Sequence, residues 1–159
     1  MKIFIKYLCI ILPHLGIALI VLAMILGYYY NWRGKAVLLT TDKTNVFITK
    51  NQELKIVPHA FTLLNFNVTN FESGRPKKIE AIINIEENDQ TKSVSLSVNH
   101  PYKIGFGQDL YLISYDQQNE NPEYCVVELV YDPFQGVFLT GIILVMLGMV
   151  VYLSIEKKM

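Results

Sequence analysis

The sequence predicts a membrane protein in which two transmembrane α-helices flank one all-β extracytoplasmic domain, an antiparallel sandwich or an open barrel. Apolar runs without a charged side chain occupy both ends of the chain, at residues 7–30 and 136–155. Between them, apolar and polar residues alternate with a period of two, which is typical of β-strands with one buried and one solvated face.

Both apolar runs are long enough to cross a membrane, since a helix rises by about 1.5 Å per residue and the hydrocarbon core is about 30 Å thick. A cleaved signal peptide is the alternative for residues 7–30. Its apolar core would have only about 7–15 residues, followed by a small-x-small cleavage site that is missing here. The run ends instead in aromatic residues typical of a membrane interface: Tyr28, Tyr29, Tyr30 and Trp32. We therefore expect a retained helix.

Two spans place both ends of the chain on one side of the membrane. The positive-inside rule assigns that side to the cytoplasm, because the tails carry Lys2, Lys6, Lys157 and Lys158. Arg33 and Lys35 follow the first span and oppose this assignment, but only Asp132 stands just before the second. The predicted order begins with a cytoplasmic tail (residues 1–6) and a transmembrane helix (residues 7–30). A β-domain (residues 31–135) follows on the periplasmic side of the inner (cytoplasmic) membrane. After it come a second transmembrane helix (residues 136–155) and a short cytoplasmic tail (residues 156–159).

The segment between the spans has the size of one domain and shows seven or eight short strand patterns. Residues 79–85 and 94–98 alternate on either side of the turn-forming residues 87–90, which predicts a β-hairpin. Further strand patterns lie at residues 36–40, 46–49, 64–69, 110–115 and 124–131. The polar stretch 117–122 is interpreted as an exposed loop. Short strands at this spacing, without a soluble helix, favour a sandwich or an open barrel.

Charge and motifs exclude several classes of function. Residues 31–135 contain 10 Lys and Arg and 13 Asp and Glu, a net charge of −3, so the domain has no electrostatic reason to bind nucleic acid. The chain has no hydrolase nucleophile elbow, phosphate loop or Gly-rich dinucleotide fingerprint. The carboxylates Asp116, Glu120 and Glu123 are interpreted as solvated surface. The sequence therefore predicts a protein that is not an enzyme.

Among the three histidines, His14 is the most informative because it lies inside the first apolar run, about 10 Å from its cytoplasmic edge. A polar ring at that depth is not expected to face lipid. Two interpretations remain open. The ring either bonds a neighbouring helix or the carbonyl that Pro13 frees, or it is a ligand of a metal or a haem iron, because neutral imidazole is a common axial ligand. His59 and His100 each stand beside a proline, which is typical of turns.

Small residues recur at helical spacing in both apolar runs: Gly16, Ala23 and Gly27 in the first, Gly141 and Gly148 in the second. Such faces allow helices to approach closely. We expect the two spans to pack on each other or on a partner; the alternative is that glycine is simply common in membrane helices.

Short strings follow one another over most of the chain: His14-Leu15-Gly16, Arg33-Gly34, Phe66 followed by Phe71-Glu72-Ser73-Gly74-Arg75-Pro76-Lys77, Val98-Asn99-His100-Pro101-Tyr102, Tyr111-Leu112-Ile113-Ser114-Tyr115-Asp116, and Asp132-Pro133 before a Gly-rich span. In their order and spacing they resemble the ResB family, the membrane subunit of the System II cytochrome c biogenesis machinery. Family members usually have further spans ahead of the histidine span and a larger domain, so the resemblance is to a short form.

The resemblance implies a role in handling haem. In this family, a histidine in the span before the extracytoplasmic domain is one of two haem ligands within the membrane, and His14 is the residue that matches it. The second ligand comes from a partner, a CcsA/ResC-like membrane protein with a Trp-rich haem-binding loop. Together the two subunits carry haem outward for attachment to the CxxCH motifs of apocytochrome c.

We therefore expect a ResB-like subunit of cytochrome c maturation that helps move haem across the bilayer to a CcsA-like partner for attachment to apocytochrome c. It would be a non-catalytic subunit of a haem lyase complex, with haem shared with the partner, His14 as the candidate axial ligand, and no catalytic residues or separate metal site. The alternative is a structural or accessory subunit of another membrane complex, which uses its β-domain and helices for docking.

Overall fold

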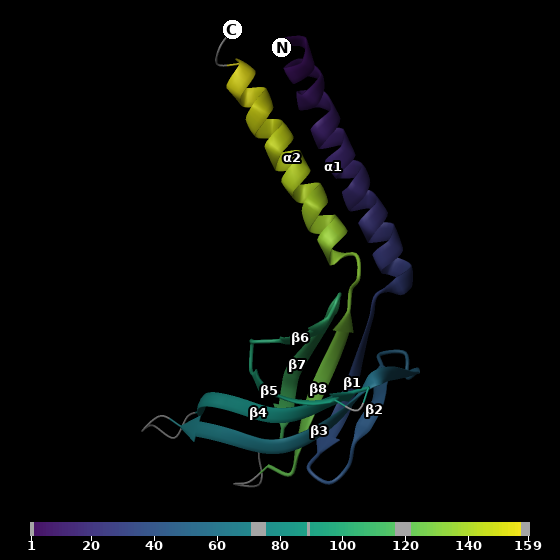
Figure 1. The fold of residues 1–159 in the computed structure, drawn as a ribbon, viewed down its shortest axis with the longest axis vertical. Coiled ribbons are helices and arrows are strands. Elements are labelled where there is room, and N and C mark those ends of the chain that lie inside the picture. Colours follow the sequence, from purple (N-terminus) through teal and green to yellow (C-terminus); the bar gives the residue numbers. More distant parts are fainter. Residues whose placement is uncertain (1, 71–75, 89, 117–121, 157–159) are drawn as a thin grey trace. The chain divides into compact units, whose positions relative to one another are not determined.

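The computed structural model describes residues 2–70, 76–88, 90–116 and 122–156. The chain forms two compact units, a helix pair (Met1–Asn31 with Asp132–Met159) and a β-unit (Trp32–Tyr131). Figure 1 labels their elements, which are α1 (Lys2–Tyr30), β1 (Trp32–Leu39), β2 (Thr44–Thr49), β3 (Leu54–Asn70), β4 (Pro76–Glu87), β5 (Gln90–Ser97), β6 (Tyr102–Gly105), β7 (Gln108–Tyr115), β8 (Tyr124–Tyr131) and α2 (Gln135–Glu156).

The helix pair contains the two apolar runs. Residues 10–30 of α1 and 135–154 of α2 are long and apolar enough to cross a membrane, each with a mean hydropathy of 2.5. α1 begins at Lys2, ahead of the uncharged run that starts at Tyr7. The two helices lie side by side (Figure 1). This confirms the predicted fold class of two long apolar helices flanking an antiparallel all-β domain.

Small residues bring the two helices into contact. A Cβ atom added to Gly16 would lie 2.6 Å from the carbonyl oxygen of Gly141, and one added to Gly148 would lie 2.5 Å from Cδ of Pro13. Ala23, on the same face of α1, is buried. The expectation that the spans pack on each other is therefore confirmed for these positions. Gly27 does not make such a contact with α2, because the nearest atoms to a Cβ added there belong to the side chain of Asn31, which follows α1.

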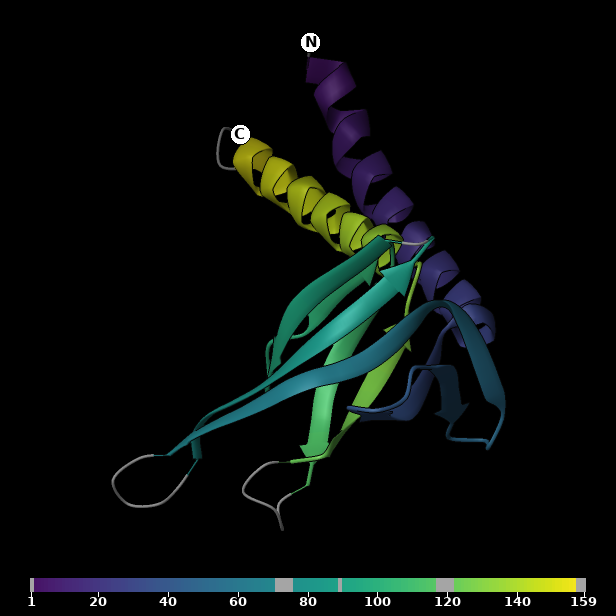
Figure 2. The same ribbon diagram turned by 60° about the horizontal axis from the view of Figure 1, so that its bottom comes forward.

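The β-unit is one eight-stranded sheet in the order β5-β4-β3-β2-β1-β8-β7-β6, and every neighbouring pair is antiparallel. The edge strands β5 and β6 follow each other in the chain and lie close together. An isolated bridge between Ser97 and His100 closes the turn after β5. β5 also approaches β7, so the sheet curls back towards itself (Figure 2). Of the two expected architectures, this is the open barrel.

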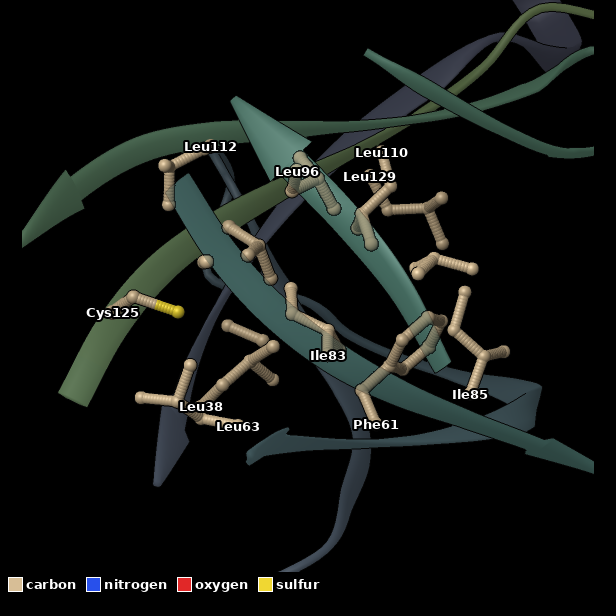
Figure 3. Packing of buried hydrophobic residues seen from close by; sticks show 14 of the residues in the cluster. Leu38, Phe61, Leu63, Ile83, Ile85, Leu96, Leu110, Leu112, Cys125 and Leu129 are labelled. Carbon is tan, nitrogen blue, oxygen red and sulfur yellow. The ribbon is translucent and has the colours of Figure 1, made fainter. Parts of the chain in front are cut away.

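Alternation explains how the sheet encloses its core. In β1, Ala36 and Leu38 are buried, whereas Lys35 and Val37 are exposed. Side chains from seven of the strands meet inside the curl, as Figure 3 shows for ten labelled residues: Leu38, Phe61, Leu63, Ile83, Ile85, Leu96, Leu110, Leu112, Cys125 and Leu129. Phe47 of β2 joins them with its ring edge-on to Phe61, at 5.5 Å between centroids.

The predicted hairpin is confirmed as β4 and β5, which pair from Glu80 with Ser97 to Glu87 with Gln90. Val98, expected to continue the second strand, is instead 42% exposed and lies outside it. The chain turns there because Asn99 adopts a φ of 64°, a left-handed conformation that asparagine tolerates better than most residues. The predicted loop 117–122 lies outside the described residues except for Pro122, which is buried.

β3 is much longer than expected, and it corrects the interpretation of His59 as a turn residue. The strand runs without a break from Leu54 through Pro58 and His59 to Asn70. The pairing of β3 with β2 shifts register between Val46–Ile56 and Thr44–Phe61, and Pro58 falls in this irregular stretch. A proline cannot donate to a ladder of hydrogen bonds, so it fits in a strand where the pairing is interrupted.

Candidate functional site in the helix pair

His14 lies in the middle of α1, one residue after the helix-interior proline Pro13. Its Nδ1 atom is 2.6 Å from the carbonyl oxygen of Ile10, one turn earlier. A carbonyl oxygen only accepts, so Nδ1 carries the proton and donates. The bond stays within α1, and it uses the carbonyl of Ile10 rather than that of Cys9, which Pro13 leaves without its helical donor. The expected bond to a neighbouring helix is thus not what holds the ring.

The ring of His14 faces away from α2. Pro13 and Gly16 make the contacts with α2, and His14 is exposed. Two residues correspond to about 200° around a helix, which places His14 nearly opposite Gly16. Its helical neighbours on that side are apolar and exposed as well: Ile10, Ile11 and Ile17.

This geometry determines which nitrogen of His14 is available. Because Nδ1 is the donor to Ile10, Nε2 of the neutral ring presents its lone pair, and the described part of the chain offers it no hydrogen bond. A hydrogen bond from one ring nitrogen to a backbone carbonyl fixes the tautomer and ring orientation of metal-binding histidines. The residues present therefore fit a single axial imidazole ligand on an apolar helix face.

The described residues contain no group of three or more His, Cys, Asp or Glu side chains that could hold a metal ion on its own. His14 is also the one histidine in the sequence of the helix pair.

The other two histidines belong to the β-unit. His59 is 8% exposed, and its Nε2 atom lies 3.1 Å from a carboxylate oxygen of Glu87 on the neighbouring strand. Its Nδ1 atom is buried and has no hydrogen-bond partner among the described residues, and its ring centroid is 6.3 Å from that of Phe61. His100 is exposed, and its backbone N–H donates to the carbonyl of Ser97. His59 is a core residue, and His100 closes the turn between β5 and β6.

The expected acidic surface cluster is only partly solvated. Asp116 is 5% exposed, and its backbone N–H donates to the carbonyl oxygen of Tyr124 at 3.2 Å. This bond lies where β7 ends beside the start of β8. Glu123 is exposed, whereas Glu120 lies outside the described residues. The cluster therefore does not form a pair of carboxylates facing one another among the described residues.

The outer face of β2 and β3 carries a strip of exposed apolar side chains that the strand patterns did not single out. Ile48 pairs across the strands with Leu54, and Val46 pairs with Ile56. Ile48, Leu54 and Ile56 are 53%, 66% and 75% exposed. The signal in the sequence is the unbroken apolar run Val46-Phe47-Ile48, in which Phe47 enters the core and its two neighbours point outward. Apolar patches of this kind commonly mark protein interfaces.

Comparison with known proteins gives one family. The model of the ResB-like family matches residues 2–125, which include α1 with His14 and the sheet up to the second residue of β8. No curated protein matches the chain.

Proposed function

The chain belongs to the ResB-like family, and we propose that it binds haem through His14 in a cytochrome c maturation complex and helps pass it to a CcsA-like partner. Membership in the family makes the chain a component of cytochrome c biogenesis in general. Haem is the cargo here, and the complex would attach it to apocytochrome c.

The observation that carries the proposal is the orientation of the His14 ring. Its Nδ1–H is engaged with Ile10, which leaves the Nε2 lone pair on the face of α1 that does not contact α2. A histidine that merely braced the helix pair would point towards α2. The apolar neighbours Ile10, Ile11 and Ile17 offer a surface against which a flat, largely apolar ring can lie.

The role of the chain in this scheme is to bind and orient its cargo. The bond from Nδ1 to Ile10 sets the ring plane and makes Nε2 more basic. The apolar side chains around His14 keep water away, and this strengthens the interaction between Nε2 and a metal cation. The second ligand would come from the CcsA-like partner, so that neither subunit holds the cargo alone.

The strip on the β-unit favours a second candidate function, that of an accessory subunit in another membrane complex. Ile48, Leu54 and Ile56 form an exposed apolar strip, and a docked subunit would cover it. Such a subunit needs no haem. The two candidates therefore differ in what purifies with the chain: haem with a CcsA-like protein in the first, and other subunits without haem in the second.

The test is the haem content of the complex purified in mild detergent. His14→Ala should leave the chain folded and inserted, because alanine favours a helix and the change removes only one bond to Ile10. Haem per complex, measured by absorption, should nevertheless fall strongly. His100→Ala is the matched control, since it removes an exposed histidine of the β-unit and should leave haem unchanged. Equal haem in both variants, or none in the wild-type complex, would contradict the proposal.

A further inference from the structure

A groove of about 350 Å³ opens within the helix pair, beyond the close contact at Gly16 and Gly141. The groove is lined on one side by the last two turns of α1. On the other side it is lined by the first turn of α2 and the residues that precede this helix. The volume falls in the range of about 300–1,000 Å³ that is usual for small-molecule sites. The groove exists because Ala23 and Gly27 have almost no side chain to fill the space.

The lining of the groove divides into an apolar and a polar part. Ala23, Gly27 and Phe138 come from the apolar stretches of the two helices, whereas Asn31, Asp132 and Gln135 come from their ends. Three consecutive tyrosines, residues 28–30, surround the end of α1, and tyrosine is enriched at the level of lipid headgroups. The groove is therefore amphipathic, and its polar part lies at the end of the span where headgroups are found.

Charge limits what can enter the groove. Among the described residues that line it, Asp132 is the one with a charged side chain. One carboxylate oxygen, Oδ1, accepts the backbone N–H of Phe134 at 3.2 Å, and the described residues offer Oδ2 no partner. The aromatic residues Tyr28 and Phe134 also line the groove, and aromatic faces attract ammonium groups. The carboxylate and the aromatic residues of this lining together favour a cation.

We propose that this groove binds a membrane phospholipid whose headgroup carries a cationic ammonium, such as phosphatidylethanolamine. The ammonium pairs with the Asp132 carboxylate, the side-chain amides of Asn31 and Gln135 donate to the phosphate, and the upper acyl chain lies against Gly27 and Phe138. An anionic lipid such as phosphatidylglycerol offers no cation to Asp132, so it should bind less tightly. The lipid site is separate from His14 and does not depend on haem.

The experiment compares the two lipids with matched acyl chains, added to the full chain in detergent. Bound lipid is measured by native mass spectrometry, and the thermal unfolding midpoint is followed in parallel. Wild type should retain phosphatidylethanolamine in preference to phosphatidylglycerol and should be stabilised more by it. Equal or stronger retention of phosphatidylglycerol, or retention of neither lipid, would overturn the proposal.

Three variants tie the preference to the groove. Asp132→Asn keeps an oxygen for the N–H of Phe134 but removes the charge, so the apparent affinity for phosphatidylethanolamine should fall about tenfold and the preference should vanish. Asp42→Asn, the same change at an exposed turn of the β-unit, should preserve both. Gly27→Leu should prevent retention of either lipid, because the larger side chain fills the groove. The fold should accept the change, because the nearest atoms to an added Cβ, at 2.9 Å and beyond, belong to the flexible Asn31 side chain. An unchanged preference in Asp132→Asn, or retention of phosphatidylethanolamine by Gly27→Leu, would show that the lipid binds elsewhere.

Discussion

Gly16 and Gly141 face each other so closely that a Cβ on Gly16 would lie 2.6 Å from the Gly141 carbonyl oxygen, and a Cβ on Gly141 would lie 2.7 Å from that of Gly16. Together with the close approach of Gly148 to Pro13, this reciprocal contact joins α1 to α2. Helices in lipid gain little from burying apolar side chains against each other, so their association depends on packing at such small residues.

Enlarging one of these glycines should weaken the helix pair. Gly141→Val places methyl groups against the backbone of α1 and should destabilise the pair by about 1–3 kcal/mol. The control is Gly136→Val in the same helix, where a Cβ has no neighbour within 4 Å. Thermal unfolding in detergent compares the two, and equal midpoints for both variants would show that the glycine contact does not stabilise the pair.

The buried thiol of Cys125 should make the β-unit sensitive to alkaline pH. Burial raises the pKa of Cys125 from about 9 to about 12, because the thiolate is penalised in the core. Between these values only the unfolded chain loses the proton, so stability is retained below pH 9 and falls as the pH rises towards 12, by about 1.4 kcal/mol per unit. Cys125→Ala removes this contribution. Its stability relative to wild type should therefore rise across the same window, and a constant difference would contradict the burial of the thiol.

The orientation in the membrane can be tested with thiol labelling. Thr41 is exposed between β1 and β2, and Cys125 gives little background because its pKa of about 12 keeps it protonated. Thr41→Cys should react with a membrane-impermeant reagent in intact spheroplasts, whereas Lys157→Cys should react only after lysis. The opposite pattern would place the β-unit in the cytoplasm and remove the maturation proposal with it.

His59 should behave as a core residue rather than a site. The part of the chain that the structure describes offers its buried Nδ1 atom no partner, so His59→Leu loses no bond there and should change the free energy of unfolding by less than about 1 kcal/mol. Phe61→Ala, on the same strand, should cost about 3–5 kcal/mol because it empties the centre of the core. Chemical unfolding measures both. If His59→Leu lowered the free energy of unfolding by several kcal/mol, the ion pair between His59 and Glu87 would stabilise the sheet more than the half-exposed Glu87 side chain suggests.

Much of the fold could be predicted from local patterns. The two apolar runs and the alternation in residues 36–40 and 124–131 correspond to α1, α2, β1 and β8, since burial of one face imposes a period of two on each strand. The length of β3 could not be predicted, because Pro58 looks like a break until the register shift of β2 beside it is known. The curl of the sheet, in which β5 approaches β7, depends on contacts across the sheet that no local pattern contains.

The candidate site was predictable in identity but not in geometry. His14 stands out as a polar ring in an apolar run, and that is a property of the sequence alone. Which nitrogen it presents depends on the distance to the Ile10 carbonyl, and which face it occupies depends on the packing of Gly16 against Gly141. The groove at Asp132 combines the ends of two helices that lie about a hundred residues apart in the chain, so no spacing rule could reveal it.

The most direct test of the central claim is chemical replacement of the His14 imidazole. In the purified His14→Ala complex, free imidazole should enter the vacated space and restore the haem absorption in proportion to its concentration, because it supplies the ligand nitrogen that the variant lacks. The His100→Ala complex should show no response, since its haem content is already that of wild type. If imidazole leaves the haem absorption of His14→Ala unchanged while wild type holds haem, His14 is not the axial ligand.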